Sequence, residues 1–158
     1  MCAFGEEHSK ECQVFSSLED KISVEDFTRP HKVYWSITTL RLLWLRQEQP
    51  DRYAIIERMM SHTEESHSTK ELTMKMYKEN VVDFLREKCK LADRYTEEDI
   101  FHILGVLDVN SVKVSGNKGH GLYALTSLLS HSCISNSKSV LKMDVSLIVF
   151  FEHKYSGN

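Results

Sequence analysis

The stretch from Thr96 to Val114 reads T-E-E-D-I-F-H-I-L-G-V-L-D-V-N-S-V-K-V, and its pattern changes period partway along. Thr96 followed three residues later by Asp99 has the form of a helix capping box. Apolar residues then recur at helical spacing, at Ile100, Ile103, Leu104 and Leu107. After Asn110, apolar and polar residues alternate, as in a short strand. The stretch therefore predicts a helix that leads directly into a strand.

Three more helices are expected upstream. The first has Ser36 as its N-cap and ends before Pro50, and we expect it to be buried because it is apolar on nearly every side. The second begins at Pro50 or Asp51. The third is longer and carries apolar residues at three- and four-residue steps from Leu72 to Cys89, with Cys89 as a small core hydrophobe. Residues 1–35 are expected to be irregular.

Downstream of Asn110 the pattern favours strands. A glycine-bearing turn is expected over 116–121, with a short strand at 122–124. The β-branched and aromatic run 144–151 is predicted to be a strand without an identified partner, and such a run is an aggregation risk. The fold class that follows is α+β, predominantly α-helical, with a four-helix block and a partial β-fold.

Composition limits the function classes. The chain has 158 residues, 41% hydrophobic and 27% charged, which is ordinary for one soluble domain. Its net charge of −3 and scattered basic residues argue against direct binding of nucleic acid. The longest apolar run is too short to span a bilayer, so no membrane association is expected.

The cysteines and the N-terminus bear on localisation. Four cysteines in 158 residues are too few for a disulfide scaffold. The first residues are polar and charged where a signal peptide needs an apolar run. We therefore expect an intracellular protein of the nucleus, the cytoplasm or both.

The stretch from Gly119 to Asn136 carries the one chemical motif of the chain, G-H-G-L-Y-A-L-T-S-L-L-S-H-S-C-I-S-N. It resembles the core motif of the SET domain in SMYD-family protein-lysine methyltransferases, in particular the insect SmydA-like proteins with SET and MYND domains. In that family Gly-x-Gly-Leu-Tyr is followed by Ser-Leu-Leu and by Asn-His-Ser-Cys-x-Pro-Asn. Read without the resemblance, the segment is a glycine turn, a short buried helix and a polar loop.

The resemblance implies S-adenosyl-L-methionine as cofactor and protein-lysine methylation, with histones among the substrates, as the activity. Carried over by position, the cofactor-binding residues are Asn110, Ser130 and His131. Asn110 lies in Val109-Asn110-Ser111-Val112, which is similar to the family's cofactor-side strand. Read as local structure alone, Asn110 is a helix C-cap. The implied partners are protein substrates or chromatin-associated proteins.

Ser130 stands where the family has asparagine. A hydroxyl on a short side chain replaces an amide with two donors and an acceptor. We expect the change to cost about 1–3 kcal/mol of cofactor binding unless water substitutes.

His8 and Cys12 have the His-x3-Cys spacing that closes the second zinc site of a MYND finger, with Glu11 before the cysteine. A tetrahedral structural zinc site needs four ligands, and upstream the chain adds only Cys2. These residues resemble the remnant of a finger, and we expect no zinc binding by this chain alone.

The resemblance covers residues 8–142 and only the middle of a SMYD protein. It divides the chain into a finger remnant and linker (1–35), a helical SET-insert block (36–109), a partial SET core (110–142) and a divergent tail (143–158). The family's N-terminal SET strands, its catalytic tyrosine context and its post-SET cysteines have no counterpart. We therefore expect a truncated chain that is inactive or nearly so, and we assign no catalytic residue.

Two alternatives stay open at this stage. The chain is a non-catalytic helical interaction module, or a truncated isoform that competes for partners. Otherwise it is a mis-spliced product without a function of its own.

Overall fold

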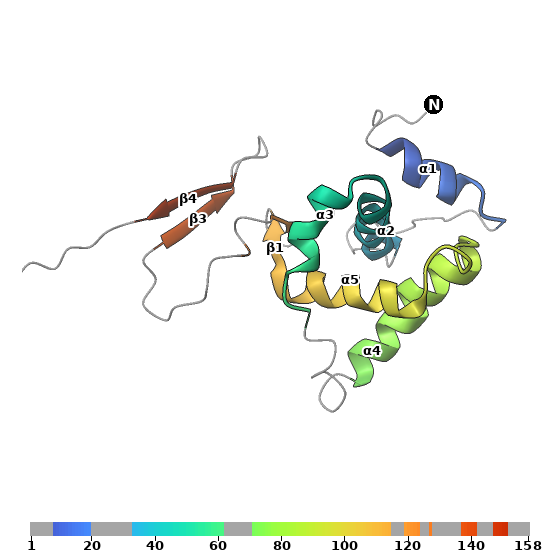
Figure 1. Cartoon of the computed structure of the whole chain (residues 1–158). Helices are drawn as coiled ribbons and strands as arrows, with labels where there is room; N and C mark the ends of the chain where they lie inside the picture. The colour runs from blue at the N-terminus through green and yellow to red at the C-terminus, as the bar shows by residue number, and fades with distance from the viewer. Residues whose placement is uncertain are drawn as a thin grey trace, which may run out of the picture. The chain divides into compact units, whose positions relative to one another are not determined.

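The computed structural model describes residues 8–19, 33–61, 71–114, 119–123, 127, 137–141 and 147–151. It is mostly helical with small antiparallel strand pairs, which confirms the predicted fold class (Figure 1). The chain divides into two compact units, Met1–Val109 and Asn110–Asn158. The division falls where the helical period gives way to alternation.

The first unit is built of helices, and α5 ends one residue beyond it. They are α1 (Ser9–Ser16), α2 (Val33–Glu48), α3 (Pro50–Glu57), α4 (Glu71–Tyr77), η3 (Lys78–Val82), η4 (Phe84–Lys88) and α5 (Glu97–Asn110). The helix expected from Leu72 to Cys89 is thus found as α4, η3 and η4 in succession. Its later turns are π-helical, so that the Asp83 N–H donates to the Lys78 carbonyl and the Cys89 N–H to the Phe84 carbonyl.

Two expectations for the N-terminal region are wrong. Residues 1–35 were expected to be irregular, yet they contain α1 and the first turn of α2. Ser36 was expected to be an N-cap, yet it lies inside α2 and is fully buried. Serine is a weak helix former that favours caps when local chemistry alone decides. Here the packing of α2 decides, because Ser36 is part of the buried core of the helical unit.

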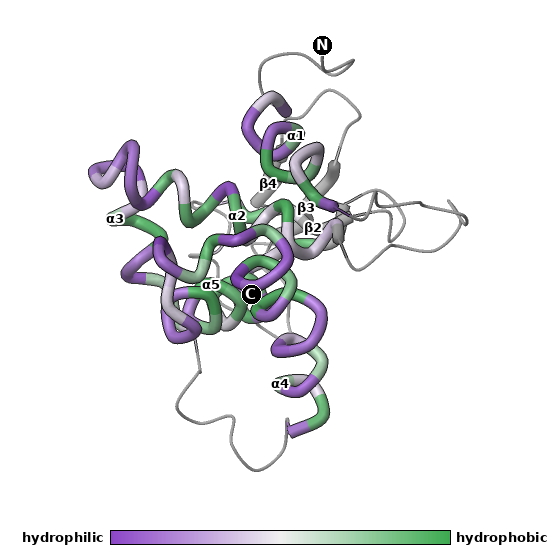
Figure 2. Tube along the Cα trace, turned by 90° about the vertical axis from the view of Figure 1, so that its right-hand side faces the viewer, coloured by the Kyte–Doolittle hydropathy of each residue, from purple (hydrophilic) through white to green (hydrophobic). Residues whose placement is uncertain are grey.

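The core of this unit is apolar and contributed by helices far apart in sequence. Its fully buried apolar residues are Leu40, Leu43, Val81, Val82, Leu85, Ile100, Ile103 and Val106. They come from α2, from the π-helical turns and from α5, whose apolar stretches are green in Figure 2. Cys89 is also buried, as predicted, and burial raises the pKa of its thiol to about 11. The thiol is therefore protonated at neutral pH.

The capping box predicted at the start of α5 is confirmed. The Asp99 N–H donates to Thr96 Oγ1 at 3.1 Å, and the Thr96 N–H donates to Asp99 Oδ2 at 3.0 Å. The two residues satisfy each other's backbone donors, which fixes the first residue of the helix. At its other end, α5 finishes at Asn110, and the first strand begins at the next residue.

The second unit contains two antiparallel pairs. Strand β1 (Ser111–Val114) pairs with β2 (Gly119–Leu122), and β3 (Ser137–Leu141) pairs with β4 (Leu147–Phe151). The strands predicted around Val112 and within 144–151 are confirmed, and the second has β3 as its partner. The strand expected at 122–124 is misplaced, because pairing with β1 begins at Gly119 and ends at Leu122.

No helix in the described part of the chain is both long enough and apolar enough to cross a membrane.

Candidate functional site

The junction between α5 and β1 holds Asn110, the one predicted cofactor-site residue that the structure describes. Its backbone carbonyl accepts a hydrogen bond from Ser127 Oγ at 3.0 Å. Ser127 belongs to the Gly119–Asn136 motif, 17 residues further along. The hydrogen bond therefore joins the end of the helix to the middle of the motif. Ser130 and His131 lie outside the described residues.

Ser127 has a second local partner. Its Oγ is 3.0 Å from the Tyr123 carbonyl, and its N–H donates to the same carbonyl at 2.9 Å. A hydroxyl carries one hydrogen, so Oγ shares it between the carbonyls of Asn110 and Tyr123. The side chain of Ser127 thus links Tyr123, the residue after β2, to Asn110, the residue before β1.

The β1–β2 hairpin positions the glycines of the motif. Its register places Val112 opposite Gly121 and Val114 opposite Gly119. A Cβ on Gly121 would lie 2.6 Å from Cε2 and 3.0 Å from Cζ of the Tyr123 ring. A side chain at position 121 would therefore push the ring away. The second glycine and the tyrosine of the motif are linked through this close approach.

At the other end of the chain, His8 and Cys12 flank a polar contact. The Glu11 carboxylate is buried and pairs with the Arg41 guanidinium of α2. His8 Nδ1 is 3.6 Å from Glu11 Oε1 and 3.4 Å from Arg41 Nη2, while Cys12 is exposed. Among the described residues, no three His, Cys, Asp or Glu side chains form a group able to hold a metal. In this segment the ion pair between Glu11 and Arg41 joins α1 to α2.

A hollow of about 500 Å³ lies next to this contact. It is lined by Lys10, Glu11, Arg41, Trp44, Leu45, Glu48, Gln49 and Arg52. Four of its charged side chains form ion pairs with one another, Lys10 with Glu48 and Arg41 with Glu11. The hollow was not predicted from the sequence, because Lys10 and Glu11 line it from α1, a helix that was not predicted.

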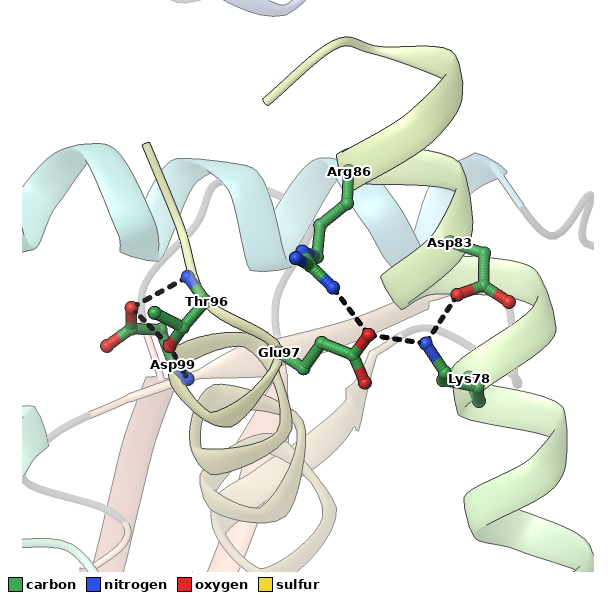
Figure 3. Close-up of polar contacts among 6 residues, drawn as sticks. All are labelled: Lys78, Asp83, Arg86, Thr96, Glu97 and Asp99. Atoms are coloured by element: carbon green, nitrogen blue, oxygen red, sulfur yellow. Dashed lines mark hydrogen bonds and ion pairs between the residues drawn. The ribbon is translucent and has the colours of Figure 1, made fainter. Parts of the chain in front are cut away.

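A charged cluster joins the π-helical turns to α5 (Figure 3). Glu97 Oε1 accepts hydrogen bonds from Arg86 and, at 2.7 Å, from Lys78 Nζ, which also reaches Asp83 Oδ1 at 2.7 Å. The hydrogen bonds to Asp83 and then Glu97 raise the pKa of Lys78. Nearby, Arg46 donates to Asp99. Each charged residue of the cluster has an ion-pair partner, although Arg86 Nε is buried without a hydrogen-bond partner in the described part of the chain, and the cluster connects η3 and η4 to α5.

Tyr77 and Asp108 make a second bridge to α5. Tyr77 Oη donates to Asp108 Oδ1 at 2.6 Å, and the ring of Trp35 meets that of Tyr77 edge-on with centroids 6.1 Å apart. Burial, and then the hydrogen bond to Asp108, raise the pKa of Tyr77. The phenol is therefore protonated at neutral pH and acts as a hydrogen-bond donor.

Sequence reasoning missed the charged cluster and the Tyr77–Asp108 bridge. The acidic first turn of α5, Glu97 to Asp99, was visible as a helix N-terminus. Nothing local identifies which distant cations meet it, because that depends on how the helices pack.

The chain was compared with known proteins, and no family model, no curated protein and no solved structure matches it.

Proposed function

We propose that this chain is a SET-type module similar to the SMYD proteins, which binds S-adenosyl-L-methionine weakly and, as these 158 residues, transfers no methyl group. The observation that carries the proposal is the motif from Gly119 to Asn136 together with Asn110 at its upstream distance. The hydrogen bond from Ser127 to the Asn110 carbonyl supports it, because it ties two of the motif-matched positions together.

Asn110, Ser130 and His131 are the residues that would hold the cofactor. An amide, a hydroxyl and an imidazole offer both donors and acceptors, which suits the amino and carboxylate ends of an amino-acid moiety. When bound, the cofactor would offer an electrophilic methyl group, and its transfer to a lysine amine would depend on positioning and desolvation. Of the three residues, Asn110 has its backbone held at the junction of α5 and β1 by the hydrogen bond from Ser127, which would help to position it for the cofactor.

Transfer needs more than a cofactor cradle. The amine must enter a dry channel that orients it, and we find no tyrosine in the family's catalytic context in these residues. The partners implied by the proposal are protein substrates or chromatin-associated proteins, bound without turnover.

Isothermal titration of the full chain with S-adenosyl-L-methionine tests the proposal. We expect a measurable heat of binding that His131→Ala abolishes, and Ser130→Asn should raise the affinity about 5- to 150-fold, the counterpart of about 1–3 kcal/mol. His102→Ala is the matched control, since His102 lies on α5 outside the motif, and it should leave binding unchanged. Absence of heat with both the wild type and Ser130→Asn rejects the proposal.

A radiolabelled-methyl assay with histones as substrate tests the second part. We expect incorporation at the level of a protein-free blank. Incorporation that depends on the chain and disappears in His131→Ala would show an active enzyme and would overturn this part alone.

The second candidate function is a helical interaction module. It is favoured by large apolar side chains that the helical unit leaves exposed, namely Tyr34 at 48%, Trp35 at 40% and Leu72 at 84%. Apolar residues of this kind serve as anchors in protein interfaces. This function predicts that Trp35→Ala and Leu72→Ala weaken capture of a protein partner while His131→Ala does not.

A further inference from the structure

Strand β4 combines two properties that are costly in an isolated hairpin. Leu147 to Phe151 reads L-I-V-F-F, with no charge, no proline and no glycine. Among the described residues, β4 pairs with β3 and with no other strand, so its second edge presents backbone donors and acceptors without a strand partner. Such an edge is a template for pairing with another strand.

The partner strand does not match β4 in character. The register sets Ser137 opposite Phe151, Lys138 opposite Phe150 and Ser139 opposite Val149. Three of the five β4 residues therefore have a polar cross-strand neighbour. A two-stranded hairpin is marginally stable in water, and three or more strands with an apolar face are needed for independent stability. The β3–β4 pair (Figure 1) gains most from a further strand that is as apolar as β4.

A second copy of β4 meets this requirement. In an antiparallel pair centred on Val149, Leu147 lies opposite Phe151 of the second copy and Ile148 opposite its Phe150. Every cross-strand pair then joins two apolar residues. Each chain carries a net charge of −3, but no charged residue lies within the two paired β4 strands. The two-fold symmetry closes the assembly at two chains.

We propose that the second edge of β4 is a self-association site, at which β4 of another copy of this chain pairs antiparallel to give the four-stranded order β3–β4–β4–β3. The backbone hydrogen bonds supply affinity, and the uninterrupted apolar run supplies selectivity for a like strand. The site is independent of cofactor binding, so it stands or falls apart from the proposed function.

The test is sedimentation equilibrium on the full chain across a range of concentrations. We expect the mass to rise from that of one chain to that of two and then to stop. Val149→Lys places two lysines opposite each other at the centre of the pair and should raise the dimer dissociation constant at least about tenfold. Ser139→Lys adds the same charge on β3 and is the matched control, which should still dimerise.

A charge exchange then tests the register. Val149→Lys and Val149→Asp should each be monomeric alone, and an equimolar mixture should dimerise, because the central pair becomes lysine with aspartate. The helical signal at 222 nm should stay constant in all variants, since β4 lies outside the helical unit. The proposal is overturned by a wild type that is monomeric at every concentration, by open-ended fibres, by equal effects of the two lysine variants, or by a mixture that stays monomeric.

Discussion

Each of the two units of this chain is stabilised internally by a different kind of interaction. In the helical unit, Leu40, Leu43, Leu85, Ile100 and Ile103 are completely buried, and charged bridges join one helix to the next. In the second unit the residues whose burial is described are all partly exposed, and they are ordered by backbone pairing and by the hydrogen bonds of Ser127. Burial of apolar surface is the dominant stabilising term in folding. Asn110, which is proposed to contact a cofactor, belongs to the unit in which no residue of described burial is fully buried, and a ligand has most to add there.

The largest expected effect comes from the helical core. Leu43→Ala should lower the free energy of unfolding by about 2–5 kcal/mol, because it leaves a cavity at a fully buried position of α2. Urea denaturation followed at 222 nm measures it. Leu72→Ala removes the same atoms from an 84% exposed position and should change stability by less than about 0.5 kcal/mol. Equal effects would mean that the helical unit has no packed core.

The N-cap of α5 should matter next. Thr96→Ala removes the hydroxyl that accepts from the Asp99 N–H and should cost about 1 kcal/mol in the same denaturation experiment. Thr96→Ser keeps that hydroxyl, so it should recover most of the loss. If serine is as damaging as alanine, the capping hydrogen bond is not the source of the effect.

Ser36 offers a gain of stability inside the same core. Its Oγ is buried and has no hydrogen-bond partner in the described part of the molecule, whereas Thr39 Oγ1, on the same helix and equally buried, donates to the Trp35 carbonyl at 3.0 Å. Ser36→Ala should therefore stabilise the helical unit by about 1 kcal/mol. Thr39→Ala, the matched change, should destabilise it. A loss at both positions would show that the Ser36 hydroxyl is satisfied.

Acid should weaken the start of α5. Burial opposes ionisation of Asp99, but the hydrogen bonds from Arg46 and Thr96 outweigh it and lower the pKa of the carboxyl below 3.8. A lowered pKa in the folded state contributes stability that is complete above 3.8 and lost as the pH falls through the lower value. Because Arg46 is partly exposed, we expect about 0.2–1 kcal/mol. Thermal unfolding should show that the melting temperature falls less between pH 6 and pH 2.5 for Asp99→Asn than for the wild type.

The smallest expected effect sharpens the contrast between units. Gly121→Ala should displace the Tyr123 ring, because the new Cβ meets it at 2.6 Å, yet it should leave helical unfolding unchanged within about 0.5 kcal/mol. The ring resonances of Tyr123 in NMR spectra report the displacement. A large fall in helical stability would mean that the two units unfold together.

Much of the fold was predictable because its signals are local. The capping box at Thr96 and the change of period at Asn110 set the start and end of α5 from neighbouring residues alone. The failures have a common cause. Helix α1 escaped prediction because its central feature, Glu11 buried against Arg41, joins residues 30 positions apart. For the candidate site, the sequence supplied Asn110, Ser130 and His131, and the structure describes the first of them.

The sequence by itself determined that this chain is mostly helical and that the helices give way to strands at Asn110, because periodicity and caps act over a few residues. The tertiary structure decided which charges meet at Glu97, that Ser36 is a core residue rather than a cap, and that Ser127 fixes the end of α5. These contacts depend on how elements distant in sequence pack, and no local pattern encodes that packing.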